Sequence, residues 1–208
     1  GEATPLGSIA ALLFAAVNDD VHLGLQTSYM LVNFCNQASF VEGMNEPGKS
    51  KVLRKMLSEW ITRSEGVVAQ QCMALAIRYD LKEGLIPATR ILRNRGEQPL
   101  VRQTALMTVA KLGDATHVHL LETALDDASR ISAHRIDNVQ YETQLRDVAL
   151  AAVLILRRQD PKQFGFDRIR MNESTVFNFG TIGFENEDKR KQAFAKYQEF
   201  KTGSDQPR

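Results

Sequence analysis

Residues 99–114 read PLVRQTALMTVAKLGD, and two other stretches of the chain repeat the same pattern. The apolar side chains of this stretch stand at Val101, Ala105, Leu106, Val109 and Leu112. At about 100° per residue these positions form one stripe along a helix, whereas a strand would alternate between two faces. The stretch therefore predicts an amphipathic helix that buries one face.

The repeated pattern lies in residues 67–80 (VVAQQCMALAIRYD) and 143–160 (TQLRDVALAAVLILRRQD). The residues that correspond to the first stripe are Val68, Cys72, Met73, Ala76 and Tyr79, and then Leu145, Ala149, Leu150, Val153 and Leu156. The helices in between also repeat, since Leu85, Ala88, Ile91 and Leu92 are matched 33 residues later by Val118, Leu121, Ala124 and Leu125. The repeating unit is thus a pair of helices.

Neither helix of such a unit can bury its apolar stripe alone, and a row of stacked units solves this problem. We therefore expect an all-α fold, an α-solenoid of about four helix pairs in which Met73, Leu106 and Leu150 share one core. The expected pairs are about 5–17 with 22–37, 50–62 with 66–79, 82–95 with 99–112, and 115–126 with 143–158.

The stretch VRQTALMTVAKLGD resembles the second helix of a HEAT repeat, with its hydrophobe-Arg pair, its Ala four residues into the helix and its closing Leu-Gly-Asp. LRDVALAAVLIL is similar to the same element, and the tight motifs cover residues 67–158. The resemblance implies a right-handed α-solenoid of HEAT-like pairs whose second helices line the concave side. The side chains of Arg102 and Arg146 are expected to pack between repeats.

Two regions depart from the regular repeat. Residues 1–160 are expected to form the helical array, with an insertion at about residues 127–142, and residues 161–208 an aromatic C-terminal loop and a final capping helix. Five phenylalanines of the loop (Phe164, Phe166, Phe177, Phe179, Phe184) and one face of the last helix (Ala193, Phe194, Tyr197, Phe200) suit a cap, and an aromatic ligand pocket is the alternative. The insertion is either a binding loop or a poorly ordered excursion.

Composition sets the broad class. The 26 basic and 25 acidic residues nearly balance, which disfavours nucleic acid as the partner, and no apolar run is long enough to span a bilayer. Cys35 and Cys72 lack CxxC spacing and are expected to be buried free thiols. The chain begins with Gly1 instead of Met, so the compartment stays open, with export after removal of a signal peptide favoured over the cytoplasm.

The sequence offers little for catalysis. His117 and His119 would point about 200° apart on a helix and could not share a metal ion, and His22 stands alone. Nucleotide-binding, hydrolase and metalloprotease motifs are missing. We therefore expect no enzyme activity, no cofactor and no metal.

Binding has more support. Residues 49–111 carry twelve basic and five acidic residues, a band that suits an acidic partner. Two positions of each second helix face away from the stripe. The first holds Gln70, Gln103 and Asp147, and the second holds Arg78 and Lys111. The insertion adds His134 and Arg135. These residues are the predicted contacts of a non-catalytic protein-binding scaffold. The alternatives are a HEAT-like enzyme or carrier for a small molecule, similar to bilin lyases, and a weak nucleic-acid binder.

Overall fold

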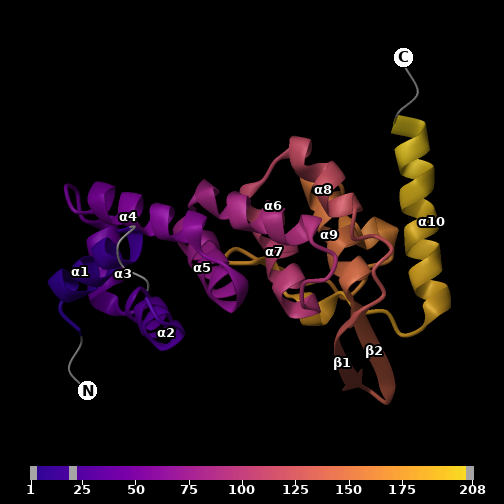
Figure 1. The fold of residues 1–208 in the computed structure, drawn as a ribbon. Coiled ribbons are helices and arrows are strands. Elements are labelled where there is room, and N and C mark those ends of the chain that lie inside the picture. The colour runs from indigo at the N-terminus through magenta and orange to yellow at the C-terminus, as the bar shows by residue number, and fades with distance from the viewer. Residues whose placement is uncertain (1–3, 19–22, 205–208) are drawn as a thin grey trace.

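The computed structural model describes residues 4–18 and 23–204, which are mostly helical (Figure 1). The α-helices are α1 (Leu6–Val17), α2 (Leu25–Phe34), α3 (Ala38–Asn45), α4 (Ser50–Arg63), α5 (Gly66–Tyr79), α6 (Leu85–Arg93), α7 (Pro99–Leu112), α8 (Val118–Glu122), α9 (Leu145–Leu156) and α10 (Glu187–Ser204). The 3-10 helices are η1 (Lys82–Gly84), η2 (Ala115–His117), η3 (Pro161–Phe164) and η4 (Phe179–Thr181). Within these residues no helix has the length and apolar character that a bilayer crossing needs.

The helices form two layers that run along an elongated molecule. In one layer α1 contacts α4, α4 contacts α6 and α6 contacts α8. In the other layer α2 contacts α5, α5 contacts α7 and α7 contacts α9. Figure 1 shows the row beginning with α1–α3 at one end and finishing with α8, α9 and α10 at the other.

The three repeated stretches are the helices α5, α7 and α9, as the periodicity predicts. Of the fifteen stripe positions all are buried except Val68 and Leu156, which are half-buried. Met73, Leu106 and Leu150 belong to one continuous core, which confirms that expectation. The small residues that the pattern places at one stripe position, Cys72 and Ala149 among them, are fully buried and allow neighbouring helices to approach closely.

The predicted helix 22–37 is wrong in its extent. Its predicted start at residue 22 lies outside the described residues, α2 ends at Phe34, and a separate helix α3 follows after a turn at residues 35–37. Gly43 explains how α3 fits, because a Cβ atom at this position would lie 2.8 Å from Leu6 Cδ2 and 3.0 Å from Leu53 Cδ1. The helix thus packs closely between α1 and α4.

The helical content fits the all-α prediction, but two small antiparallel sheets that it did not include are also present. The insertion forms a hairpin of β1 (Arg130–Ile136) and β2 (Val139–Gln144) in which His134 lies opposite Tyr141, instead of a loop. Its turn residues Asp137 and Asn138 have φ values of 47° and 64°, the left-handed conformation that a tight two-residue hairpin turn requires. The second sheet pairs β3 (Met171–Asn172) with β4 (Val176–Phe177).

Residues 161–204 fold against the last helix pair. Phe164, Phe166, Phe177 and Phe184 are buried in the same core as α9, whereas Phe179 is 36% exposed. On α10, Ala193 and Tyr197 are buried, and Phe194 and Phe200 are partly buried against this core. The four apolar positions predicted on one face of the final helix therefore all contact the core.

Ion pairs fix the C-terminal helix to the array. Arg190 of α10 donates from Nε to Asp147 of α9 over 2.9 Å, and both side chains are buried. Arg146 makes hydrogen bonds of 2.8 and 3.0 Å to the two carboxylate oxygens of Glu187. Arg102, predicted to pack between repeats, is buried and pairs with Asp127 in the segment that precedes β1.

Candidate functional site

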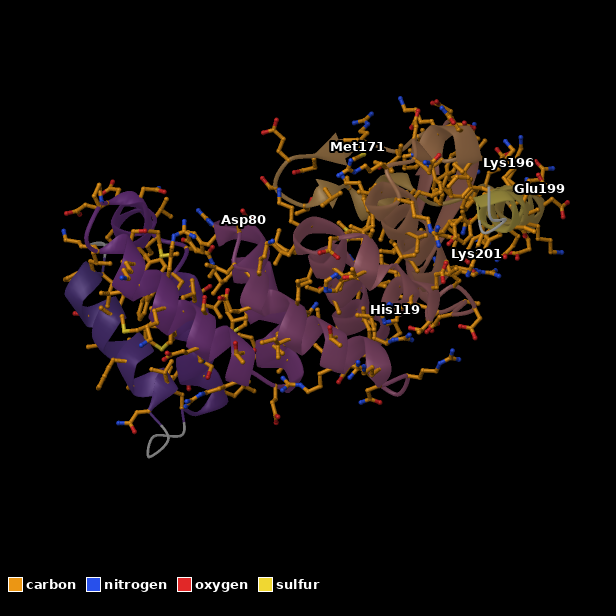
Figure 2. All side chains as sticks on the ribbon, turned by 90° about the horizontal axis from the view of Figure 1, so that it is seen from above. Asp80, His119, Met171, Lys196, Glu199 and Lys201 are labelled. Carbon is orange, nitrogen blue, oxygen red and sulfur yellow. The ribbon has the colours of Figure 1, made fainter. Side chains whose placement is uncertain are left out.

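The largest hollow that gathers predicted site residues is a groove between α5, α7 and the segment 172–179, which we call the α5–α7 groove. It has a volume of 1040 Å³. Figure 2 labels Asp80, at the end of α5, and Met171, beside the wall that the segment 172–179 forms. The lining includes Arg78, Gln103 and Lys111, three of the residues that the repeat pattern predicts as partner contacts.

The groove combines an apolar floor with two cations, Arg78 and Lys111, and its lining also includes two acidic residues, Asp80 and Glu173. Ile77, Met107 and Phe177 are buried side chains on its floor. Arg78 donates from Nη1 to Asn36 Oδ1 over 2.6 Å, and Lys111 donates from Nζ to the carbonyl oxygen of Glu173 over 2.6 Å. A guanidinium has five N–H donors and an ammonium three, so both groups keep donors for a ligand.

The segment 172–179 forms one wall through a tight local turn. The Asn172 side chain accepts hydrogen bonds from the backbone N–H groups of Ser174 and Thr175. Val176 has a φ of 72°, a conformation that is unfavourable for a β-branched residue. The hydrogen bond from Lys111 to Glu173 ties this turn to α7.

Exposure of the equivalent face falls from α5 to α9, which corrects part of the prediction. Gln70 on α5 is half-buried, and Gln103 on α7 is 7% exposed because the segment 172–179 covers this face. Asp147 on α9 was expected to face outward, but it is fully buried under Arg190. As placed, Asp147 holds α10 and cannot contact a partner.

Two further groups of predicted residues lie outside the groove. Gln70 donates from Nε2 to Thr104 Oγ1 over 3.3 Å and joins α5 to α7 outside the lining of the groove. His134 and Arg135 line a separate cleft between β1 and the segment 167–181. The structure therefore assembles three of the seven predicted residues into one site.

Sequence periodicity does not identify the segment that completes the groove. Nothing in residues 172–179 follows the helical repeat, and their contact with α5 and α7 depends on how the chain folds back after α9. Arg168 and Arg170 were also missed, although their spacing places two basic side chains in a short connecting segment.

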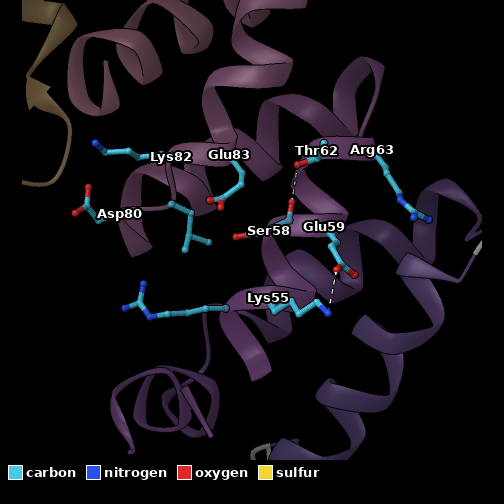
Figure 3. Close-up of a pocket in the computed structure, with 10 residues that line it drawn as sticks. Lys55, Ser58, Glu59, Thr62, Arg63, Asp80, Lys82 and Glu83 are labelled. Atoms are coloured by element: carbon cyan, nitrogen blue, oxygen red, sulfur yellow. Dashed lines mark hydrogen bonds and ion pairs between the residues drawn. The ribbon is translucent and has the colours of Figure 1, made fainter. Parts of the chain in front are cut away.

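A second hollow lies between α4 and η1 and has a volume of 780 Å³ (Figure 3). Some of its polar side chains have partners: Lys55 pairs with Glu59 at 3.8 Å, Thr62 donates to the carbonyl oxygen of Ser58, and Arg54 donates to that of Tyr79. None of the seven predicted contact residues lies in its lining, so this hollow is a weaker candidate than the α5–α7 groove.

The described residues contain no group of histidine, cysteine and acidic side chains that could hold a metal ion. His117 instead faces Asp114, whose pKa is lowered to about 2 by hydrogen bonds from Thr116 and His117. Cys35 and Cys72 are buried free cysteines, as expected, and burial raises the pKa of the Cys72 thiol to about 12.

Comparison with known proteins identifies no relative of this chain. No family model matches this chain, and neither the curated proteins nor the solved structures contain a match.

Proposed function

We propose that the chain is a short HEAT-like α-solenoid that acts as a non-catalytic protein-binding scaffold, with the α5–α7 groove as its docking surface. The observation that supports this most directly is the meeting of Arg78, Gln103 and Lys111, from two successive second helices, over one apolar floor. The order of contacts within each helix layer suits a row of stacked pairs. Such a row holds a wide surface in place at little ordering cost on binding.

The chemistry of the groove favours a partner segment with apolar and acidic side chains. Ile77 and Met107 offer an apolar contact, and aromatic and Met side chains are frequent at protein interfaces. Arg78 and Lys111 offer hydrogen bonds to carboxylates, which are stronger than bonds between neutral groups. The partner would place its apolar side chains on the floor and its carboxylates toward the two cations.

Affinity capture from the native host tests this proposal when the same bait carries Arg78→Glu and Lys111→Glu. Two lost charge-assisted contacts, each worth about 1.5 kcal/mol, weaken binding by roughly 100-fold. The matched control is Lys51→Glu with Lys55→Glu on α4, which reverses the same charge away from the groove. A partner that is lost with the groove variant and kept with the control supports the proposal, whereas a partner kept with both contradicts the proposed surface.

A small-molecule carrier is the second candidate, because ligand pockets of several hundred Å³ are typical and the groove has 1040 Å³. A thermal-shift screen against nucleotides, tetrapyrroles and metal ions separates the two. A large shift with one of these compounds that is absent from an Arg78→Glu variant, at an exposed residue of the lining, favours the carrier.

A further inference from the structure

Another cleft collects basic side chains for which the described residues provide no hydrogen-bond or ion-pair partner. We call it the basic cleft and define it by His134 and Arg135 of β1 and by Arg168 and Arg170 of the segment before β3; its volume is 710 Å³. Asp167 is the acidic side chain in its lining. The cleft and the α5–α7 groove adjoin, because Asn178 lines both.

The charges of the basic cleft are unbalanced. Among the described residues, the side chains of Arg135, Arg168 and Arg170 make no hydrogen bond and no ion pair. Elsewhere in the chain Arg102, Arg146 and Arg190 are held by carboxylates. The lining thus has three arginines and one carboxylate, an excess of positive charge that a bound anion would reduce.

Arg168 is oriented before any ligand arrives. Its guanidinium carbon lies 3.8 Å from the centroid of the Tyr141 ring, so the group stacks on the aromatic face. Its Nη1 atom is buried and has no hydrogen-bond acceptor, which is a costly arrangement for a donor. A guanidinium stacked by its face keeps the accessible part of its N–H edge for an oxyanion in its plane.

The imidazole of His134 is placed in the same cleft by a glycine. A Cβ atom at Gly180 would lie 3.0 Å from His134 Nε2, so a larger residue at this position would press against the ring. Because His134 lies opposite Tyr141 in the hairpin, the imidazole and the stacked guanidinium share one region of the sheet. The cleft therefore offers the imidazole of His134 and the guanidinium of Arg168 to one ligand, and Arg170 also lies in its lining.

We propose that the basic cleft binds a phosphate monoester carried on a side chain of the partner protein. A phosphate monoester has a charge between about −1.5 and −2 at pH 7 and three acceptor oxygens, which matches several guanidinium groups better than one carboxylate does. The protein source follows from the adjoining groove, since one extended segment could lie on the apolar floor and pass Asn178 into the cleft. This inference rests on the proposed scaffold function and names the chemistry of its partner.

Calorimetric titration with a phosphoserine peptide, its unphosphorylated form and inorganic phosphate tests the proposal. The protein should bind the phosphopeptide at least tenfold more tightly than either other probe at low salt. A variant with Arg168→Gln and Arg170→Gln should lose at least tenfold in this affinity. The control variant, Arg93→Gln with Lys191→Gln, removes the same charge at exposed sites on α6 and α10 and should bind as the wild type does.

Three results would overturn the inference: no binding of the phosphopeptide, equal affinity for inorganic phosphate, or an equal loss in the control variant. Its failure can be told apart from failure of the scaffold proposal. A partner captured through Arg78 and Lys111 that survives phosphatase treatment leaves the scaffold in place and removes the phosphate site. A phosphopeptide bound through Arg168 while capture finds no partner supports the site and contradicts the groove.

Discussion

The two ends of the helical row differ in whether other parts of the chain cover their apolar side chains. At the C-terminal end, α10 covers the last pair with Tyr197 and Ala193 and is fixed by the buried pair of Arg190 and Asp147. At the N-terminal end, Phe14 of α1 is 63% exposed and Leu25 of α2 is 53% exposed.

In the proposed stack of helix pairs, this difference has a physical origin. A helix pair inside a row buries both sides, whereas a terminal pair has a neighbour on one side and must cover the other by different means. The C-terminal end uses a helix with one polar and one apolar face, and the same fold-back covers α9 and forms the wall of the α5–α7 groove. The same segment therefore both covers the C-terminal end and completes the candidate site.

The largest expected effect comes from breaking the buried pair at the C-terminal end. Arg190→Met leaves the carboxylate of Asp147 buried without its ion-pair partner, which should lower the free energy of unfolding by about 3–5 kcal/mol. Urea titration followed by circular dichroism measures the loss. The control is Lys49→Met near the N-terminal end, where the pair with Glu46 is half exposed and is worth at most about 1 kcal/mol. Equal losses in the two variants would contradict the asymmetry.

The same pair should give stability a pH dependence. Burial raises the pKa of Asp147 to about 6, although the Arg190 guanidinium acts to lower it. Because this pKa exceeds the unfolded value of about 3.9, the folded state holds the proton more tightly, and the contribution is present below about pH 4 and lost as the pH rises through 6.

This contribution to the free energy of unfolding is at most about 3 kcal/mol, because the pKa of Asp147 differs by about two units between the folded and unfolded states. Unfolding of the wild type and of Asp147→Asn should be measured from pH 4 to pH 7. The wild type should lose stability relative to the variant over this range. Parallel curves would show that Asp147 does not titrate there.

A smaller effect is expected from two tyrosine hydroxyls. The hydroxyl of Tyr197 on α10 donates to Glu122 of α8, so Tyr197→Phe should lower the free energy of unfolding by about 1.5 kcal/mol. The matched substitution at the other end, Tyr29→Phe, removes a hydroxyl from an exposed ring and should change stability by less than about 0.5 kcal/mol. Thermal unfolding of both variants measures the two losses of stability. A larger loss for Tyr29→Phe than for Tyr197→Phe would contradict the prediction.

The regular part of this fold could be predicted because its signal is local. The stripe positions of α5, α7 and α9 are separated by turns of one helix, so periodicity alone identifies which side chains are buried. The hairpin also left a local signal, since Asp137 and Asn138 tolerate the left-handed conformation of its turn, but the helical repeat on both sides favoured a loop.

The rest depends on contacts between residues far apart in the chain. Asp147 and Gln103 occupy outward positions on their own helices and are buried by residues 172–190, which the repeat does not describe. The groove also depends on contacts between distant residues, because one wall consists of the repeated helices α5 and α7 and the other of the segment 172–179. Sequence periodicity could identify Arg78 and Lys111 as outward-facing residues, but not the segment that lies opposite them.

The smallest effect on stability is expected at the uncovered N-terminal end, where Phe14→Ser with Met30→Ser should change the free energy of unfolding by less than about 0.5 kcal/mol per site. Both side chains are already exposed, Phe14 at 63% and Met30 at 47%, so the folded protein loses little buried apolar area when they are replaced. The double variant should nevertheless bind less of the dye ANS, which reports exposed apolar surface. Lys51→Ser on α4, also exposed, is the control and should leave the fluorescence unchanged. If the N-terminal variant destabilises the protein as much as Arg190→Met does, then α1 and α2 bury these side chains after all, and the two ends are equivalent.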